Sequence, residues 1–176
     1  MVTVGGTAGA VLAALLLLAR GHLVAGAIVI TLFVLLDSLD GVMARVRGGS
    51  TTFGAFLDST LDRVADAAVF GGLAWWALRS DEPLLGGLLL YCLVAGSVTS
   101  YAKARAEGVG LSCDVGIAER AERLVVVLLT AGLHGLGVPH VLAAGLWLLA
   151  VASTVTVGQR VAEVRRQARA ADERVA

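Results

Sequence analysis

The chain has 176 residues, of which 57% are hydrophobic and 16% are charged, and its mean hydropathy is +0.84. This composition excludes a disordered chain and argues against a water-soluble fold. Fourteen basic and fourteen acidic residues give a formal charge of zero, so no charge excess points to nucleic acid as a partner. Cys92 and Cys113 lack the paired spacing of a disulfide framework or a zinc site, and we interpret both as packing residues.

Apolar segments separated by Gly, Pro or charged residues run through the whole chain. A membrane-spanning helix needs roughly 20 mostly apolar residues, and none of these segments alternates with the period of two that is typical of a strand. We therefore predict an all-α integral membrane protein, a bundle of six transmembrane helices forming one domain over residues 1–176. The expected spans are Gly5–Ala19, Leu23–Ala44, Phe53–Leu78, Leu84–Ala102, Ile117–Leu136 and His140–Gly158.

The first span is short and begins almost at Met1. A secretory signal peptide is the alternative for this segment. It is disfavoured because the segment has no basic region before it and no convincing small-residue cleavage site after it.

The basic residues between the spans predict an orientation. Only Arg20 and Arg79 fall in the connections on one side. The other side carries eleven, namely Arg45, Arg47, Lys103, Arg105, Arg120, Arg123, Arg160, Arg165, Arg166, Arg169 and Arg174. Because cytoplasmic loops are enriched in Lys and Arg, this asymmetry places that side and both termini in the cytoplasm.

Five aspartates crowd into thirty residues at the predicted cytoplasmic ends of the second and third spans: Asp37, Asp40, Asp58, Asp62 and Asp66. A carboxylate at bilayer depth costs roughly 2.5–3.5 kcal/mol on insertion scales, so the group needs compensation. The first two are three residues apart and the next two are four apart, so each pair projects from one face of its helix. If the two antiparallel helices pair, four carboxylates converge.

An oxygen-only site of this kind suits a hard divalent cation such as Mg²⁺, Mn²⁺ or Ca²⁺. Metal-bound carboxylates near the lipid headgroups suggest phosphoryl chemistry. An acid-lined path for ions or protons, as in a divalent-cation transporter, is the alternative from another class. A merely salt-bridged helix pair is less favoured, because the acids outnumber the nearby bases.

The segment from Asp37 to Asp62 matches without gaps the pattern D-x2-D-G-x2-A-R-x8-G-x3-D-x3-D. In this respect the chain resembles the CDP-alcohol phosphatidyltransferases. That resemblance implies a six-helix membrane enzyme, usually a homodimer, which transfers a phosphatidyl group from a CDP-linked lipid to an alcohol and releases CMP.

The resemblance also assigns roles to individual positions. Asp37, Asp40 and Asp58 are expected to bind the metal, with Mg²⁺ expected and Mn²⁺ possible. Asp62 is expected to share in metal binding and to take the proton of the acceptor hydroxyl. Asp66 lies one turn further on, outside the pattern, and we expect it to do no more than support the ligands. The residues expected to bind the CDP-lipid are Thr3, Gly41, Arg45, Thr51 and Gly54.

Cations beside the acidic cluster bear on the identity of the alcohol. Arg123 enters a membrane segment, where a desolvated cation needs an anion, and a phosphorylated acceptor would supply one. The stretches TTFGAFLDSTLDRVADAAVFGG, SYAKARAEG and ERAERL look like those of actinobacterial phosphatidylinositol phosphate synthases. That resemblance implies CDP-diacylglycerol and 1D-myo-inositol 3-phosphate as substrates, with the acceptor phosphate held by Ser100, Lys103, Arg105, Arg123 and Arg160. Phosphatidylglycerophosphate synthase, which uses glycerol 3-phosphate, is the alternative.

One departure from the family concerns the beginning of the chain. Members normally have an amphipathic helix and a Pro-Asp-x-x-Thr segment before the first span, and only Thr3 of that segment is recognisable here. We therefore expect that an N-terminal juxtamembrane segment is missing from this sequence.

Overall fold

The computed structural model describes the backbone of residues 2–46 and 51–173, and the side chains of residues 5–36 and 51–173. Within these residues the chain forms α-helices joined by short turns and one longer loop, with no strand. The helices are α1 (Val2–Leu16), α2 (Leu23–Val46), α3 (Thr52–Arg79), α4 (Pro83–Glu107), α5 (Arg120–Gly135) and α6 (Val141–Asp172). The prediction of an all-helical chain is confirmed.

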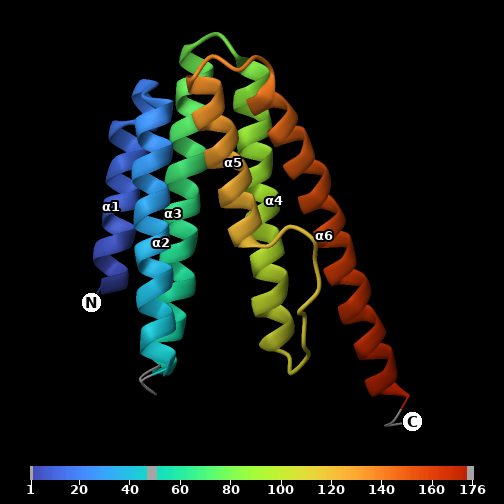
Figure 1. Cartoon of the computed structure of the whole chain (residues 1–176). Helices are drawn as coiled ribbons and strands as arrows, with labels where there is room; N and C mark the ends of the chain where they lie inside the picture. Colours follow the sequence, from blue (N-terminus) through green and yellow to red (C-terminus); the bar gives the residue numbers. More distant parts are fainter. Residues whose placement is uncertain (1, 47–50, 174–176) are drawn as a thin grey trace.

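The helices run up and down in chain order, with α1, α2 and α3 grouped at one side and α4 and α6 at the other (Figure 1). The α5 helix packs against α2 and α6, while α4 packs against α3 and α6. The α6 helix leans away from the bundle towards its C-terminal end (Figure 1).

Small residues allow the helices to approach closely. Much of the core is alanine and leucine, including Ala14 and Leu73, which are fully buried. Gly9 faces the ring of Phe33 on α2, and Gly72 faces the backbone of Ala14 on α1. A Cβ on Gly72 would lie 2.9 Å from the carbonyl oxygen of Ala14, so the α1–α3 contact depends on this glycine.

Large apolar side chains also cover the outside of the bundle. They include Leu32, Trp75, Trp147, Leu148 and Val151, each more than half exposed. Among the described residues, α4 and α6 are long and apolar enough to cross a membrane, and the apolar parts of α1 and α2 are shorter. This composition associates the chain with a membrane, since outward-facing apolar surface of this extent is unfavourable in water.

Several predicted helix boundaries differ from the structure, among them the start of the fifth helix and the end of the sixth. The fifth helix begins at Arg120 rather than at Ile117, because the backbone N–H groups of Ile117 and Ala118 donate to Thr156 Oγ1 on α6, at 3.2 and 3.0 Å. The sixth helix continues past Gly158 to Asp172, through a polar stretch rich in good helix formers. The apolar run therefore predicted the span but not the whole helix.

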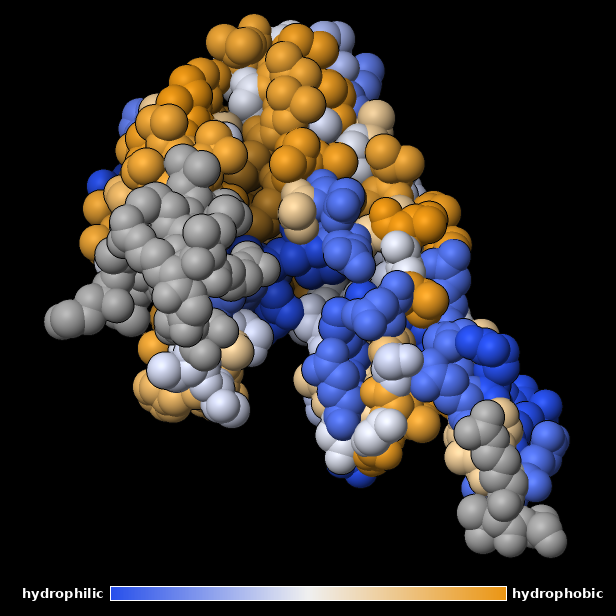
Figure 2. All heavy atoms as spheres, turned by 60° about the horizontal axis from the view of Figure 1, so that its bottom comes forward, coloured by the Kyte–Doolittle hydropathy of each residue, from blue (hydrophilic) through white to orange (hydrophobic). Residues whose placement is uncertain are grey.

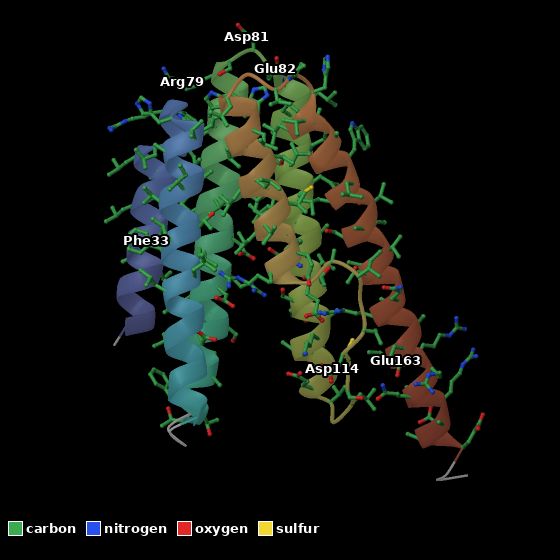
Figure 3. The ribbon with its side chains drawn as sticks, viewed as in Figure 1. Phe33, Arg79, Asp81, Glu82, Asp114 and Glu163 are labelled. Carbon is green, nitrogen blue, oxygen red and sulfur yellow. The ribbon has the colours of Figure 1, made fainter. Side chains whose placement is uncertain are left out.

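The two ends of the bundle differ in chemistry. Arg79, Asp81 and Glu82 lie at the end where α3 turns into α4 (Figure 3). The α4–α5 loop and the polar end of α6 lie towards the opposite end, with Asp114 and Glu163 (Figure 3). The α4–α5 loop and the polar end of α6, which the sequence assigned to one side of the membrane, thus share one end of the bundle.

Candidate active site

The third helix carries three acidic residues at successive turns near its beginning. Asp58 is exposed, Asp62 is half-buried and Asp66 is only 6% exposed. Thr51 caps this helix, because its Oγ1 accepts a hydrogen bond from the Gly54 backbone N–H at 3.0 Å. The cap fixes where α3 begins and therefore where its aspartates lie.

Asp62 is held by arginines from two helices. Its Oδ1 lies 2.9 Å from Nη1 of Arg120, at the start of α5, and its Oδ2 lies 3.8 Å from Nη2 of Arg63, the next residue on α3. The closer contact has the geometry of a charge-assisted hydrogen bond. The carboxylate that the sequence assigned to proton transfer is therefore oriented by Arg120.

Asp66 has a larger part in the structure than the sequence predicted. Its Oδ1 accepts a hydrogen bond from Nε of Arg120 at 3.1 Å. Its Oδ2 lies 3.6 Å from Nη2 of Arg123 and 3.8 Å from Nε of Arg63. The expectation of a minor supporting residue missed this buried junction of three arginines, although the spacing of Asp62 and Asp66, matched by that of Arg120 and Arg123, was a signal for it.

Arg123 is 2% exposed, which is exceptional for a guanidinium. Its Nη1 donates to the backbone carbonyl of Ala118 at 3.0 Å. Gly96 on α4 leaves space for it, since a Cβ there would lie 2.9 Å from the Arg123 Nε. The side chain is thus enclosed by α4, the α4–α5 loop and Asp66.

Arg160 is similarly enclosed, with 4% of its surface exposed. Its Nε donates to the carbonyl of Val115 at 2.9 Å, and its Nη1 donates to the carbonyl of Thr99 at 2.6 Å. Arg160 therefore ties α6 to the α4–α5 loop and to α4.

The remaining predicted acceptor residues lie on α4. Lys103 pairs with the Asp114 carboxylate of the loop, and the Ser100 hydroxyl donates to the carbonyl of Gly96 at 3.1 Å. Arg105 is exposed. The hydrogen bond from Lys103, reinforced by its charge, lowers the pKa of Asp114. The loop thus meets Lys103, Arg123 and Arg160.

The loop conformation depends on one glycine. Gly116 has φ +139°, in the region that side chains with a Cβ rarely adopt, and a Cβ there would collide with the Thr156 methyl group. This turn allows the next two backbone N–H groups to reach the Thr156 hydroxyl.

Several predicted positions lie outside the described side chains. These are Thr3, Asp37, Asp40, Gly41 and Arg45, so their proposed roles stay predictions. Among the side chains that are described, no three acidic, His or Cys residues gather where a metal ion could be held. Asp58 and Asp62 nevertheless supply oxygen donors one turn apart, the donor class that fits Mg²⁺ or Mn²⁺.

Polar groups concentrate around this end of the molecule. Figure 2, which turns this end forward, shows hydrophilic surface beside a recess at the centre, with hydrophobic surface above it. The arrangement brings carboxylates of α3 next to Arg120 and the buried Arg123 of α5 and places further cations on α4 and α6. Carboxylates beside cations are the kinds of group that phosphoryl transfer to a charged acceptor requires.

The helical bundle carries acidic and cationic side chains together at one end, and comparison with known proteins identifies its class. A profile of the CDP-alcohol phosphatidyltransferases matches residues 1–158. The chain belongs to this family of enzymes, and the resemblance drawn from the aspartate pattern is confirmed.

The relatives include several actinobacterial proteins. The chain is 54% identical to the phosphatidylinositol phosphate synthase of Mycolicibacterium smegmatis, over 94% of this chain and 76% of that protein. It is 51% identical to that of Streptomyces avermitilis, over 97% of this chain and 73% of that protein. The more specific resemblance to phosphatidylinositol phosphate synthases is therefore also confirmed.

Two solved structures of Mycobacterium tuberculosis phosphatidylinositol phosphate synthase share the fold. One has CDP-DAG bound and one is in complex with manganese and citrate. Each superposes with a TM-score of 0.87 at 51% identity and covers 93% of this chain, and this chain covers 84% and 80% of theirs respectively.

Proposed function

We propose that this chain transfers the phosphatidyl group of CDP-diacylglycerol to 1D-myo-inositol 3-phosphate, forming phosphatidylinositol phosphate and CMP. The observation that carries the proposal is the pairing of the aspartates of α3 with arginines at one end of the bundle, above all that of Asp66 with the buried Arg123. The identity of about half of all residues with actinobacterial phosphatidylinositol phosphate synthases supports this acceptor.

In the proposed reaction the acceptor hydroxyl loses its proton to Asp62. The hydroxyl oxygen forms a bond to the lipid-side phosphorus, and the bond from that phosphorus to the oxygen of CMP breaks. The Asp62 carboxylate is itself held by Arg120, whose Nη1 lies 2.9 Å from Asp62 Oδ1. The two reactants meet in a fixed geometry, which lowers the entropic part of the barrier.

Asp37, Asp40, Asp58 and Asp62 are the proposed ligands of Mg²⁺ or Mn²⁺. When bound, the ion neutralises the diphosphate and stabilises charge on the departing CMP. Arg45 is proposed to contact the diphosphate. Thr3, Gly41, Thr51 and Gly54 are proposed to line the cytidine site. The hydroxyl of Thr51 accepts the cap hydrogen bond, and its own O–H is free to rotate towards a ligand.

The acceptor phosphate is proposed to bind to Lys103, Arg105, Arg123 and Arg160, with Ser100 contributing a hydroxyl. Lys103 faces Asp114, which is 74% exposed in its side chain. An ion pair this exposed is weak, so a phosphate dianion can replace the Asp114 carboxylate at Lys103.

The same proposal places the chain in the plasma membrane as a single domain of six spans. Both termini and the active site face the cytoplasm, in accordance with the basic residues that share one end of the bundle. A homodimer is the proposed assembly, in contact with membrane lipids.

Purified protein in detergent, supplied with CDP-diacylglycerol and Mg²⁺, tests the proposal through CMP release. Inositol 3-phosphate is expected to support release, and free inositol and serine are not. Asp62→Asn is expected to abolish release while the protein elutes and melts as the wild type does. Release from this variant at near the wild-type rate would refute the role of Asp62, and dependence on glycerol 3-phosphate alone would refute the acceptor.

A further inference from the structure

The Arg120 guanidinium bridges two carboxylates of another helix. Its Nη1 lies 2.9 Å from Asp62 Oδ1, and its Nε lies 3.1 Å from Asp66 Oδ1. The two aspartates are one turn apart on α3, a separation that a planar guanidinium with several donors can span. Arg120 is therefore fixed at two points, and through its 2.9 Å contact it orients the carboxylate of Asp62.

The second oxygen of Asp66 faces Arg123. Asp66 Oδ2 lies 3.6 Å from Arg123 Nη2, a buried nitrogen with no hydrogen-bond partner in the described part of the chain. Arg63 Nε, 3.8 Å from the same oxygen, is in the same situation. A buried cationic N–H group that lacks a hydrogen bond is costly, so the nearby carboxylate of Asp66 helps to hold this end of the Arg123 guanidinium in place.

Among the ion pairs of the described residues, three arginines (Arg63, Arg120 and Arg123) face two aspartates (Asp62 and Asp66). The ion pairs thus hold the two arginines of α5 beside the aspartates of α3.

These contacts also join helices that are distant in the sequence. The α5 helix packs mainly against α2 and α6, and the ion pairs of Arg120 and Arg123 add a link to α3 across 54 residues or more. The link passes through Asp66, which lies between the proposed proton acceptor and the proposed acceptor-phosphate ligand.

We infer that Asp66 and Arg120 are positioning residues that fix the Asp62 carboxylate and the Arg123 guanidinium relative to each other. The inference rests on the proposed function and adds two residues to its machinery. Asp66 acts on Asp62 through Arg120 and on the acceptor phosphate through Arg123, so it sets both the attack geometry and the acceptor affinity.

Steady-state kinetics of Arg120→Gln, Arg120→Lys, Asp66→Asn and the double variant Asp66→Asn/Arg120→Gln test the inference, with kcat and KM measured for both substrates. Arg120→Gln is expected to lower kcat by on the order of 10–100-fold, because small misplacements of a reacting group have effects of that size. The KM for CDP-diacylglycerol is expected to stay within about three-fold. Arg120→Lys recovers only part of kcat, since a point charge does not bridge both carboxylates.

Asp66→Asn is expected to lower kcat and also to raise the KM for the acceptor, because it releases both Arg120 and Arg123. The double variant is expected to have a kcat close to that of the worse single variant, since the two residues act on Asp62 as one unit. The matched control is Arg79→Gln, because Arg79 is an exposed arginine at the far end of α3 (Figure 3).

The thermal midpoints of the same variants in detergent give a second double-mutant cycle, which does not depend on turnover. Because Asp66 and Arg120 are in contact, the changes in midpoint caused by the two single substitutions are not expected to add up in the double variant. A kcat of Arg120→Gln within three-fold of the control, or independent effects in the double variant, would overturn the positioning role. If one of these variants fails to fold, Asp66→Glu, which keeps a carboxylate, gives the same test. This variant is expected to keep part of the wild-type kcat, and a complete loss of kcat would contradict the inference. A wild-type chain that released no CMP with any acceptor would instead overturn the proposed function, and the positioning role with it.

Discussion

Gly96 on α4 gives a direct way to move Arg123 without altering its charge. In Gly96→Ala the new methyl group would lie 2.9 Å from Arg123 Nε and 3.2 Å from Cζ. Ordinary van der Waals contact needs about 3.5 Å or more, so the guanidinium has to shift by roughly half an ångström. Arg123 is 2% exposed and therefore has little free space to move into.

The shift is expected to weaken the Arg123 hydrogen bond to the Ala118 carbonyl, now 3.0 Å long, and the proposed contact of Arg123 with the acceptor phosphate. Hydrogen bonds to charged groups contribute about 1.5–3 kcal/mol. Loss of about one such bond corresponds to a 10–100-fold increase in the KM for inositol 3-phosphate, since 1.4 kcal/mol is about ten-fold. The KM for CDP-diacylglycerol is expected to change little.

Titration of inositol 3-phosphate at saturating CDP-diacylglycerol, with CMP as the product measured, gives both constants. Gly87→Ala on the same helix is the matched control, because a Cβ at Gly87 meets nothing within 4 Å. An acceptor KM of Gly96→Ala within two-fold of that control would refute the assignment of Arg123 to the acceptor phosphate.

Three further predictions concern stability, pH and metal. Gly72→Ala is expected to lower the thermal midpoint, because the new Cβ would lie 2.9 Å from the Ala14 carbonyl oxygen and overpacking costs about 1–3 kcal/mol. Gly71→Ala is the control, since a Cβ at Gly71 meets nothing within 4 Å. Equal midpoints for the two variants would contradict the proposed packing. The lowered pKa of Asp114 means that its pair with Lys103 stabilises the fold above the ordinary aspartate pKa of about 3.9 and is lost as the pH falls through the lowered value. The difference in midpoint between wild type and Asp114→Asn is therefore expected to be constant from about pH 5 to 8 and to vanish only well below pH 4; a change near pH 6 would argue against this assignment. Removal of divalent cations with EDTA is expected to abolish CMP release, with recovery on addition of Mg²⁺ or Mn²⁺; release that persists in EDTA would count against the metal site.

Much of the fold could be predicted from the sequence because apolar runs of this length have few structural solutions. The all-helical chain and the approximate helices followed from that rule. The start of α5 could not be predicted in this way, because Ile117 and Ala118 are apolar. Their non-helical conformation depends on the hydroxyl of Thr156, far along the chain.

The candidate site shows the same division. The pattern of aspartates indicated the family, because the chemistry requires these residue types at fixed spacing on α2 and α3. The importance of Asp66 was missed because its partners, Arg120 and Arg123, come from another helix. A buried ion pair between distant segments leaves only a weak trace in the sequence, here the matching helical spacing of two acids and two bases.

The choice of acceptor is the central claim, and a competition experiment tests it most directly. Purified protein is given CDP-diacylglycerol, Mg²⁺ and equal concentrations of inositol 3-phosphate and glycerol 3-phosphate, and the lipid products are separated by mass. The proposed function predicts phosphatidylinositol phosphate as the main product, in amounts equal to the CMP released. Phosphatidylglycerophosphate as the main product, or CMP release without a new phospholipid, would contradict it.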